Sequence, residues 1–254
     1  MTTLLYDSTF EGLMTAVFEV FEYKYDVVEI VAQQNYSQEN FFAETHEVIT
    51  DFTKSDRVLK KLEENLGKQG ISQLMMVYFS ERKDLERLIL SAVWHSIKHP
   101  KQNILQDFGN EDILEISKIC RSVSRERHRM LAFVRFELLQ DEVYFAKIEP
   151  DFNVLPLIRK HFKERYADQK WMIFDLKRHY GIFYDLKEVQ FFTPDSSQLQ
   201  NFRNSEQFHH EEEKKYQKLW QRNFVKTGIP ERKNMKLHIQ WVPKRYWKYL
   251  TEKY

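Results

Sequence analysis

Carboxylates beside a predicted strand are the first candidates for chemistry in this sequence. Glu149 and Asp151 flank Pro150, and Asp168 follows further along the chain. Two carboxylates at a strand end can hold a divalent metal or act as an acid and base pair. With His128 as a proton-transfer partner, they could hydrolyse a phosphodiester or N-glycosidic bond in DNA. The structural alternative, which we favour, is that Asp151 caps the helix that begins near residue 154.

A dense basic segment precedes these carboxylates. Residues 121–129 contain four Arg together with His128. Guanidinium groups suit phosphate because each offers a planar fork of donors and stays charged at any useful pH. Arg127 and Arg129 are therefore predicted phosphate contacts. The alternative is that these side chains cap a helix C-terminus or pair with Glu126.

A second polar cluster, residues 165–171, lies between a predicted helix and a predicted hairpin. We expect Arg165 and Asp168 to form a buried ion pair that joins the helix to the sheet. The alternative is that Arg165 contacts a base or a phosphate of DNA.

The segment 229–250 alternates basic and aromatic side chains. This composition can neutralise phosphates while aromatic faces stack on unpaired bases. It makes Arg232, Lys244, Arg245 and Trp247 candidate nucleic-acid contacts. Helical spacing also allows Trp247 to be a core residue while the basic side chains stay in water.

Several function classes find no support in the sequence. The pair His95 and His99 has no evident third metal ligand, so no metal site and no cofactor is predicted. Glycine-rich phosphate loops and the Gly-x-Ser-x-Gly motif are absent. The single cysteine, Cys120, lies in an apolar stripe, where it is expected to be inert. With no secretory signal and no candidate membrane span, we expect a cytoplasmic protein that makes no membrane contact.

The charge of the chain is divided unevenly. The 254 residues include 39 basic and 38 acidic side chains, a net charge of +1. Residues 1–120 hold 12 basic and 20 acidic side chains, whereas residues 201–254 hold 13 basic and 6 acidic ones. Opposed charges of this kind suggest that the two parts pack together or that the basic part faces a polyanion.

Hydrophobic periodicity predicts an α+β fold. Helical spacing marks residues 9–22, 54–66, 71–98, 110–125, 154–166, 205–226 and 244–250, and short β-branched runs near residues 26–31 and 47–52 predict strands. From Met130 the period changes to two, which predicts one hairpin over residues 130–149 and another over 171–185, with a further strand at 188–192. The order ββαββ predicts one antiparallel sheet packed with helices. We divide the chain into a mainly helical, acidic part, 1–126, and a part of antiparallel α+β structure with a basic helical extension, 127–254.

Five sequence blocks carry a family resemblance. They are Tyr6-Asp7 with Phe10-Glu-Gly12, Arg127 to Phe136, Ile148-Glu-Pro-Asp151 with Val154-Leu-Pro156, Arg165 to Gln169 with Trp171, and Ile229-Pro-Glu-Arg232 through Arg245-Tyr-Trp247. In these blocks the sequence resembles a bacterial family of probable DNA-metabolism and repair proteins encoded beside a putative DNA-modification or repair radical-SAM protein. Some members are joined to a uracil-DNA-glycosylase-like domain. The chain departs mildly from the pattern at residues 233–235 and 242–243, and residues 23–120 match only loosely.

The resemblance implies a DNA-linked role and a radical-SAM partner, and it supplies no catalytic residue. Our first hypothesis is therefore a DNA-binding accessory protein of DNA repair or modification. The alternatives are a DNA-processing hydrolase or glycosylase that uses the carboxylates above with His128, and a protein-interaction scaffold whose acidic first part docks a basic partner.

Overall fold

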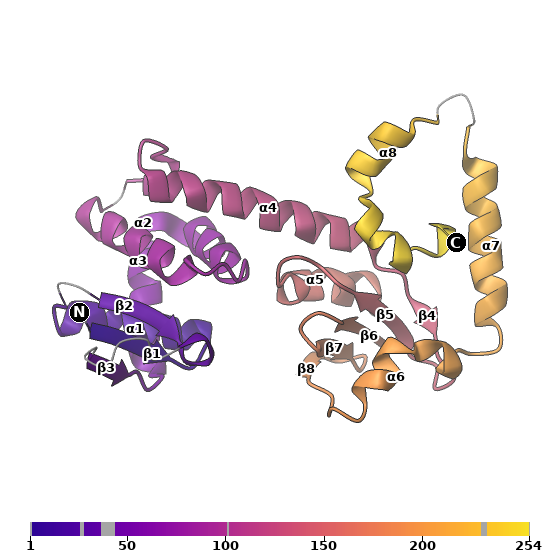
Figure 1. Cartoon of the computed structure of the whole chain (residues 1–254), viewed down its shortest axis with the longest axis horizontal. Coiled ribbons are helices and arrows are strands. Elements are labelled where there is room, and N and C mark those ends of the chain that lie inside the picture. Colours follow the sequence, from indigo (N-terminus) through magenta and orange to yellow (C-terminus); the bar gives the residue numbers. More distant parts are fainter. Residues whose placement is uncertain (1, 26–27, 37–43, 101, 230–232, 254) are drawn as a thin grey trace. The chain divides into compact units, whose positions relative to one another are not determined.

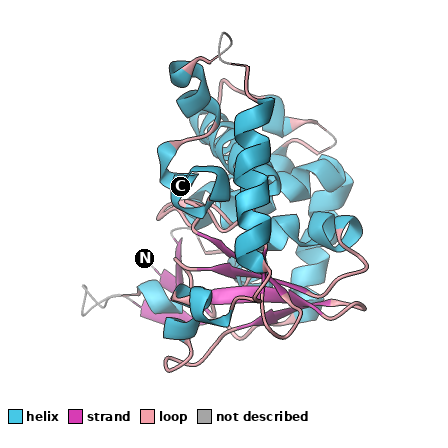
Figure 2. Ribbon diagram, turned by 90° about the vertical axis from the view of Figure 1, so that its right-hand side faces the viewer, coloured by secondary structure: helices cyan, strands magenta, loops and turns pink. Residues whose placement is uncertain are grey.

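The computed structural model describes residues 2–25, 28–36, 44–100, 102–229 and 233–253. The chain forms two compact units, Met1–Ser124 and Arg125–Tyr254. Helices and strands of both units are distinguished in Figure 2. None of the helices in the described ranges is long and apolar enough to cross a membrane.

Unit 1 is built on a parallel three-stranded sheet (Figure 1). Its strands are β1 (Thr2–Tyr6), β2 (Val28–Ala32) and β3 (Glu44–Glu47), in the order β2-β1-β3. Its helices are α1 (Phe10–Glu22), α2 (Phe52–Tyr78), α3 (Leu85–Lys98) and the first part of α4 (Glu111–Phe133). Strand β1 was not expected from the sequence, and β3 lies mostly before the strand expected over residues 47–52.

Local sequence accounts for the ends of these helices. The Thr9 hydroxyl accepts a hydrogen bond from the backbone N–H of Gly12, which confirms Thr9 as the start of α1. Inside α2, Gly67 has φ 68° and ψ 176°, so the chain is kinked directly after the helix predicted over residues 54–66 and then continues as a helix to Tyr78.

Unit 2 contains a five-stranded mixed sheet in the order β4-β5-β6-β7-β8. The strands are β4 (Glu137–Leu138), β5 (Tyr144–Ile148), β6 (Trp171–Asp175), β7 (Tyr180–Tyr184) and β8 (Val189–Phe192). The helices are α5 (Leu155–Arg165), α6 (Leu199–Arg203), α7 (Glu213–Thr227) and α8 (Met235–Trp241), and 3₁₀ turns span Ser205–Phe208, Lys244–Tyr249 and Thr251–Lys253. The α+β class and the hairpin of β6 and β7 are confirmed.

The sheet of unit 2 differs from the prediction in two ways. It is not purely antiparallel, because β5 and β6 run parallel on either side of α5 in the chain. The hairpin predicted from Met130 is shorter than expected, because α4 continues to Phe133 and β4 has two residues. The buried residues Val123, Glu126 and Met130 keep the three-to-four-residue spacing of a helix, and this spacing outweighs the apolar run that follows.

The core of unit 2 lies between α5 and the sheet. Ile158 and Phe162 of α5 and Ile173 and Ile182 of the sheet are almost fully buried. The 3₁₀ turn Lys244–Tyr249 replaces the short helix expected at 244–250, and Tyr246 and Leu250 bury their side chains. This packing places the C-terminal segment beside the end of α4.

Candidate functional site

A buried carboxylate of α4 holds the C-terminal segment of unit 2. Glu126 is 2% exposed, and its Oε2 accepts hydrogen bonds from the hydroxyl of Tyr246 at 2.6 Å and from Nη2 of Arg245 at 2.7 Å. Its Oε1 accepts the backbone N–H of Asp151 at 2.8 Å. Both oxygens therefore have donors, as a buried charge requires. We call Glu126, Asp151, Arg245 and Tyr246 the Glu126 cluster.

The side chain of Asp151 belongs to this cluster and does not cap α5. It forms an ion pair with Nη1 of Arg245. The N-cap position of α5 is Val154, which makes no side-chain cap hydrogen bond. The predicted cap is wrong because the helix begins at Leu155, so Asp151 lies one turn too early to reach its first free N–H groups.

The other carboxylate of the pair, Glu149, is also engaged. It forms an ion pair with Lys248, and its Oε2 accepts the hydroxyl of Tyr249 at 2.7 Å. The hydrogen bonds from Lys248 and Tyr249 hold the pKa of Glu149 below its usual value. A general acid at neutral pH needs a raised pKa, so this environment favours a structural role for Glu149.

The backbone between the two carboxylates is held by Arg178. Its guanidinium donates to the carbonyl of Pro150 at 3.1 Å, to that of Asp151 at 3.0 Å, and to the carboxylate of Asp175 at 2.9 Å. Asp175 is fully buried, and burial raises its pKa against the opposing effect of Arg178. The strand ends of β5 and β6 are therefore joined by an internal ionic network.

Asp168 and His128 lie apart from that network. Within the described residues, no hydrogen bond or ion pair joins either side chain to Glu149 or Asp151, and no group of three His, Cys, Asp or Glu is arranged to hold a metal ion. The predicted buried pair of Arg165 and Asp168 is wrong, because both side chains are exposed. Arg165 Nε instead donates to the hydroxyl of Tyr166 at 3.4 Å.

The predicted nucleic-acid contacts fall in several environments. Arg127 and Arg129 are half-buried on α4, and within the described residues neither has an ion-pair partner. Trp247 donates its indole N–H to the carbonyl of Val242 at 2.9 Å, and Lys244 Nζ lies 6.0 Å from the centroid of its ring. Arg232 lies outside the described residues. Arg245, in the Glu126 cluster, is committed to carboxylates.

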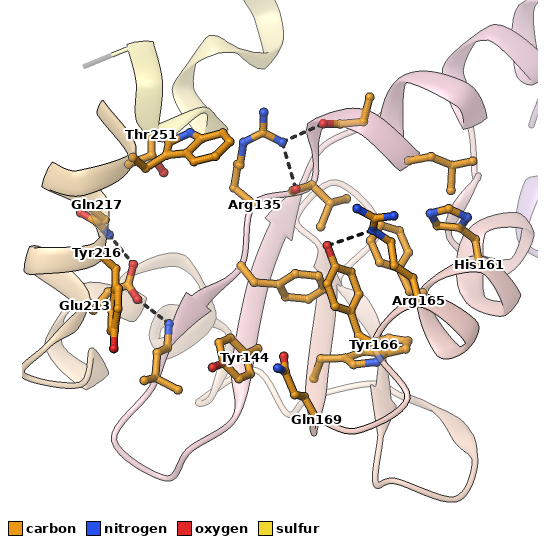
Figure 3. Close-up of a pocket in the computed structure, with 18 of the residues that line it drawn as sticks. Arg135, Tyr144, His161, Arg165, Tyr166, Gln169, Glu213, Tyr216, Gln217 and Thr251 are labelled. Carbon is orange, nitrogen blue, oxygen red and sulfur yellow. Dashed lines mark hydrogen bonds between the residues drawn. The ribbon is translucent and has the colours of Figure 1, made fainter. Parts of the chain in front are cut away.

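A large cavity opens in unit 2 beside the sheet (Figure 3). Its volume is about 1080 Å³. Its walls come from the end of α4, from β4, β5 and β6, from α5 and α7, and from Thr251. A third of the lining residues are aromatic, among them Phe136, Tyr144, Tyr166, Trp171, Tyr216 and Trp220. The lining also includes the basic or acidic side chains of His128, Arg135, His161, Arg165 and Glu213.

Helix α7 lines both this cavity and a basic groove. Tyr216 and Trp220 line the cavity, whereas Lys214, Lys218 and Arg222, together with Lys215 and Glu211, line a groove of about 410 Å³. The helix predicted over residues 205–226 was assigned neither of these roles. The signal was available, because residues 214, 218 and 222 are spaced by four and residues 216 and 220 likewise, which places each set on one helical face.

Comparison with known proteins gives a family for most of the chain. The model of a family described as "Domain of unknown function (DUF4130)" matches residues 83–252, from the end of unit 1 through unit 2. A search of curated proteins finds no match.

Proposed function

The chain belongs to the DUF4130 family, whose function is unknown. We propose, from the geometry of unit 2, that the chain is a DNA-binding accessory protein of DNA repair or modification. One observation carries the proposal. Helix α7 presents lysines and an arginine to a groove and aromatic rings to a cavity. Proteins that bind single-stranded nucleic acid combine a basic track for phosphates with aromatic platforms for bases.

The charge distribution supports the same proposal. Unit 2 holds 26 basic and 18 acidic side chains, a net charge of +8, although the whole chain carries only +1. Within the described residues, Lys214, Lys218 and Arg222 have no carboxylate partner, so their charges are available to phosphate. A local positive field attracts a polyanion even when the total charge is near zero.

The structure changes the roles that we assign to the basic residues. Lys214, Lys218 and Arg222 become the main phosphate contacts, with Arg127, Arg129 and Lys244 as further candidates. Arg245 becomes a positioning residue, because it neutralises Glu126 and Asp151 and fixes the C-terminal segment.

The identity of the partner rests on the sequence resemblance alone. We propose that the chain acts with a radical-SAM enzyme, which would carry the iron–sulfur chemistry while this chain holds the DNA. Co-purification of the two proteins, with and without nuclease treatment, tests that part of the proposal. A complex that persists after nuclease treatment supports a direct partnership, and its absence contradicts it.

DNA binding itself is tested by fluorescence polarisation with labelled single- and double-stranded oligonucleotides titrated against salt. We expect binding at 50 mM salt, with log affinity falling linearly as log salt rises. Replacing Lys214→Glu and Lys218→Glu together should weaken binding at least ten-fold and reduce the salt slope. The matched control, Lys60→Glu with Lys83→Glu in unit 1, makes the same change in net charge and should leave binding unchanged. Absence of binding at 50 mM salt contradicts the proposal.

The hydrolase alternative is less well supported, because Glu149 and Asp151 are occupied by Lys248 and Arg245. It makes its own prediction, which is loss of a cleavage activity on uracil-containing DNA in Asp168→Asn with the fold unchanged.

A further inference from the structure

We propose that the cavity of unit 2 receives a single unstacked nucleobase of a single-stranded nucleic acid. This inference rests on the proposed DNA-binding function and goes beyond it, because it assigns the ligand class and the residues that read it. The volume of about 1080 Å³ slightly exceeds the range of about 300–1,000 Å³ that is usual for ligand pockets, so a single base would fill only part of the cavity.

The indole N–H of Trp171 is a buried donor that lacks an acceptor among the residues that the structure describes. Trp171 lines the cavity and is 1% exposed, and within the described residues its indole Nε1 has no hydrogen-bond partner. An unsatisfied buried N–H costs free energy, and native structures rarely retain one without a reason. A ring carbonyl or ring nitrogen of a base is an acceptor of the required kind, although the atoms around Nε1 close it to the cavity in this structure.

The side chain of Gln169 places a primary amide at the same wall of the cavity. Gln169 lines the cavity two residues before Trp171, and within the described part of the chain its side chain makes no hydrogen bond. In the view of Figure 3 it lies between Tyr144 and Tyr166. An amide offers a donor and an acceptor side by side, which matches the edge of a nucleobase.

The wall of the cavity also contains aromatic rings. The ring of Phe136 lies 5.4 Å from that of Tyr166 and 6.3 Å from that of Trp171, measured between centroids. These rings meet at interplanar angles of 76° and 54°, so they pack edge to face or at a tilt against one another. The cavity rings open to a ligand are those of Tyr216 and Trp220, which are 49% and 44% exposed. A planar base gains from stacking on such an open ring whatever its sequence identity.

The charge around the cavity favours a nucleotide over an uncharged aromatic ligand. His128, His161 and Arg165 line the cavity, and α7, which forms one wall of it, carries Lys214, Lys218 and Arg222 in the neighbouring groove. Figure 3 shows His161 and Arg165 on the α5 side of the cavity and Tyr216 on the α7 side. A base held inside would have its flanking phosphates near the guanidinium of Arg165.

The experiment compares two oligomers of equal length and equal phosphate number, a thymidine 12-mer and the corresponding abasic 12-mer, binding to the full chain by fluorescence polarisation. We expect the base-bearing oligomer to bind at least ten-fold more tightly, the scale of base–aromatic stacking. The Gln169→Ala and Trp171→Phe variants should lower its affinity toward that of the abasic oligomer without changing the salt slope. Gln200→Ala, an exposed glutamine of α6, is the matched control and should have no effect.

The outcomes separate this inference from the proposed function. Equal affinity for both oligomers, with a normal salt slope, overturns the base cavity and leaves DNA binding intact. Binding of neither oligomer overturns both. If Trp171→Phe fails to fold, the Gln169→Ala variant carries the test alone, because Gln169 is not a core residue. Unchanged affinity of that variant for the thymidine oligomer overturns the assignment of Gln169 as the group that reads the base.

Discussion

At the scale of single residues, the clearest feature is how Glu126 is neutralised. The carboxylate is 2% exposed and is held by the side chains of Arg245 and Tyr246, more than 100 positions away in sequence. Burial, followed by the hydrogen bond to Glu126, raises the pKa of the Tyr246 hydroxyl, so it stays protonated and donates. These bonds hold the C-terminal segment on α4.

Removing Arg245 should therefore destabilise unit 2. The Arg245→Met variant leaves a buried carboxylate without its cation, and because Arg245 is itself partly exposed we expect a loss of about 2 kcal/mol in the free energy of unfolding. Urea denaturation at pH 7 measures the change. Lys170→Met, which removes an exposed cation of the same unit, should change stability by less than about 0.5 kcal/mol. Equal effects in the two variants would contradict the role assigned to Arg245.

Cys120 offers a second test at the same scale. Burial raises the pKa of its thiol to about 11, so little thiolate exists at pH 8. Alkylation by iodoacetamide should be slow in the native protein and fast in denaturing urea, as followed by intact-mass spectrometry. Rapid native alkylation at pH 8 would show that the thiol is accessible, contrary to its buried position on α4.

At the scale of elements, α2 and α7 differ in what their sequences determine: a kink in α2 and two distinct side-chain faces in α7. Gly67 divides α2 into two helical segments, because its positive φ lies in a region that residues with a Cβ rarely adopt. Helix α7 remains continuous and carries a basic face and an aromatic face. In α2 the kink at Gly67 changes the direction of the helix axis. In α7 the four-residue spacing of like side chains determines which face meets the cavity and which meets the groove.

The Gly67→Ala variant isolates the conformational effect of the kink. A Cβ at Gly67 meets no atom within 4 Å, so strain from the positive φ is the main cost, and we expect a loss of about 1 kcal/mol. Thermal and urea unfolding measure it. Gly109→Ala is the control, because Gly109 does not have a positive φ, and it should be nearly neutral. A stability gain in Gly67→Ala would contradict the strain.

The contact between α7 and the C-terminal 3₁₀ turn should depend on pH. Glu252 accepts hydrogen bonds from Arg135 at 2.7 Å and from the indole of Trp220 at 2.9 Å. Although burial opposes ionisation, these bonds hold the pKa of Glu252 below its usual value. A lowered pKa in the folded state stabilises the protein above the unfolded-state pKa, and this contribution is lost as pH falls through the folded-state pKa.

The Glu252→Gln variant tests that linkage. The stability difference between the natural protein and the variant should be full at pH 7 and should shrink progressively below about pH 4.3, the ordinary pKa of Glu. Urea unfolding at a series of pH values, followed by tryptophan fluorescence, gives the difference. A difference that is independent of pH would show that the carboxylate charge contributes nothing.

At the scale of the whole molecule, a near-neutral total charge conceals two units of opposite sign. Unit 1 holds 13 basic and 20 acidic side chains, a net charge of −7, against +8 for unit 2. Screening confines each field to about 10 Å at 0.1 M salt. Local fields should therefore govern any contact with DNA more strongly than the total.

This division of charge predicts that neutralising acidic side chains of unit 1 does not strengthen DNA binding. Asp56→Asn with Glu63→Gln, both exposed positions of α2, raises the total charge to +3. We expect single-stranded DNA affinity at 100 mM salt to change by less than two-fold, because salt screens exposed charges that do not themselves contact the DNA. A several-fold gain would show that the total charge governs binding.

The sequence by itself determined the features that depend on neighbours in the chain. Apolar periodicity located α1 and α5, and alternation located the hairpin of β6 and β7, because helices and hairpins are stabilised by contacts a few residues apart. The charge asymmetry and the spacing of basic residues on α7 were also present in the sequence. These signals were sufficient for the α+β class.

Only the tertiary structure decided which distant residues meet. Whether Asp151 capped a helix or paired with Arg245 depended on where the C-terminal segment packs, and the parallel pairing of β5 with β6 depended on how α5 crosses the sheet. The cavity likewise draws its walls from segments between His128 and Thr251. Such contacts arise from burial and shape complementarity across the whole unit, and local spacing carries no information about them.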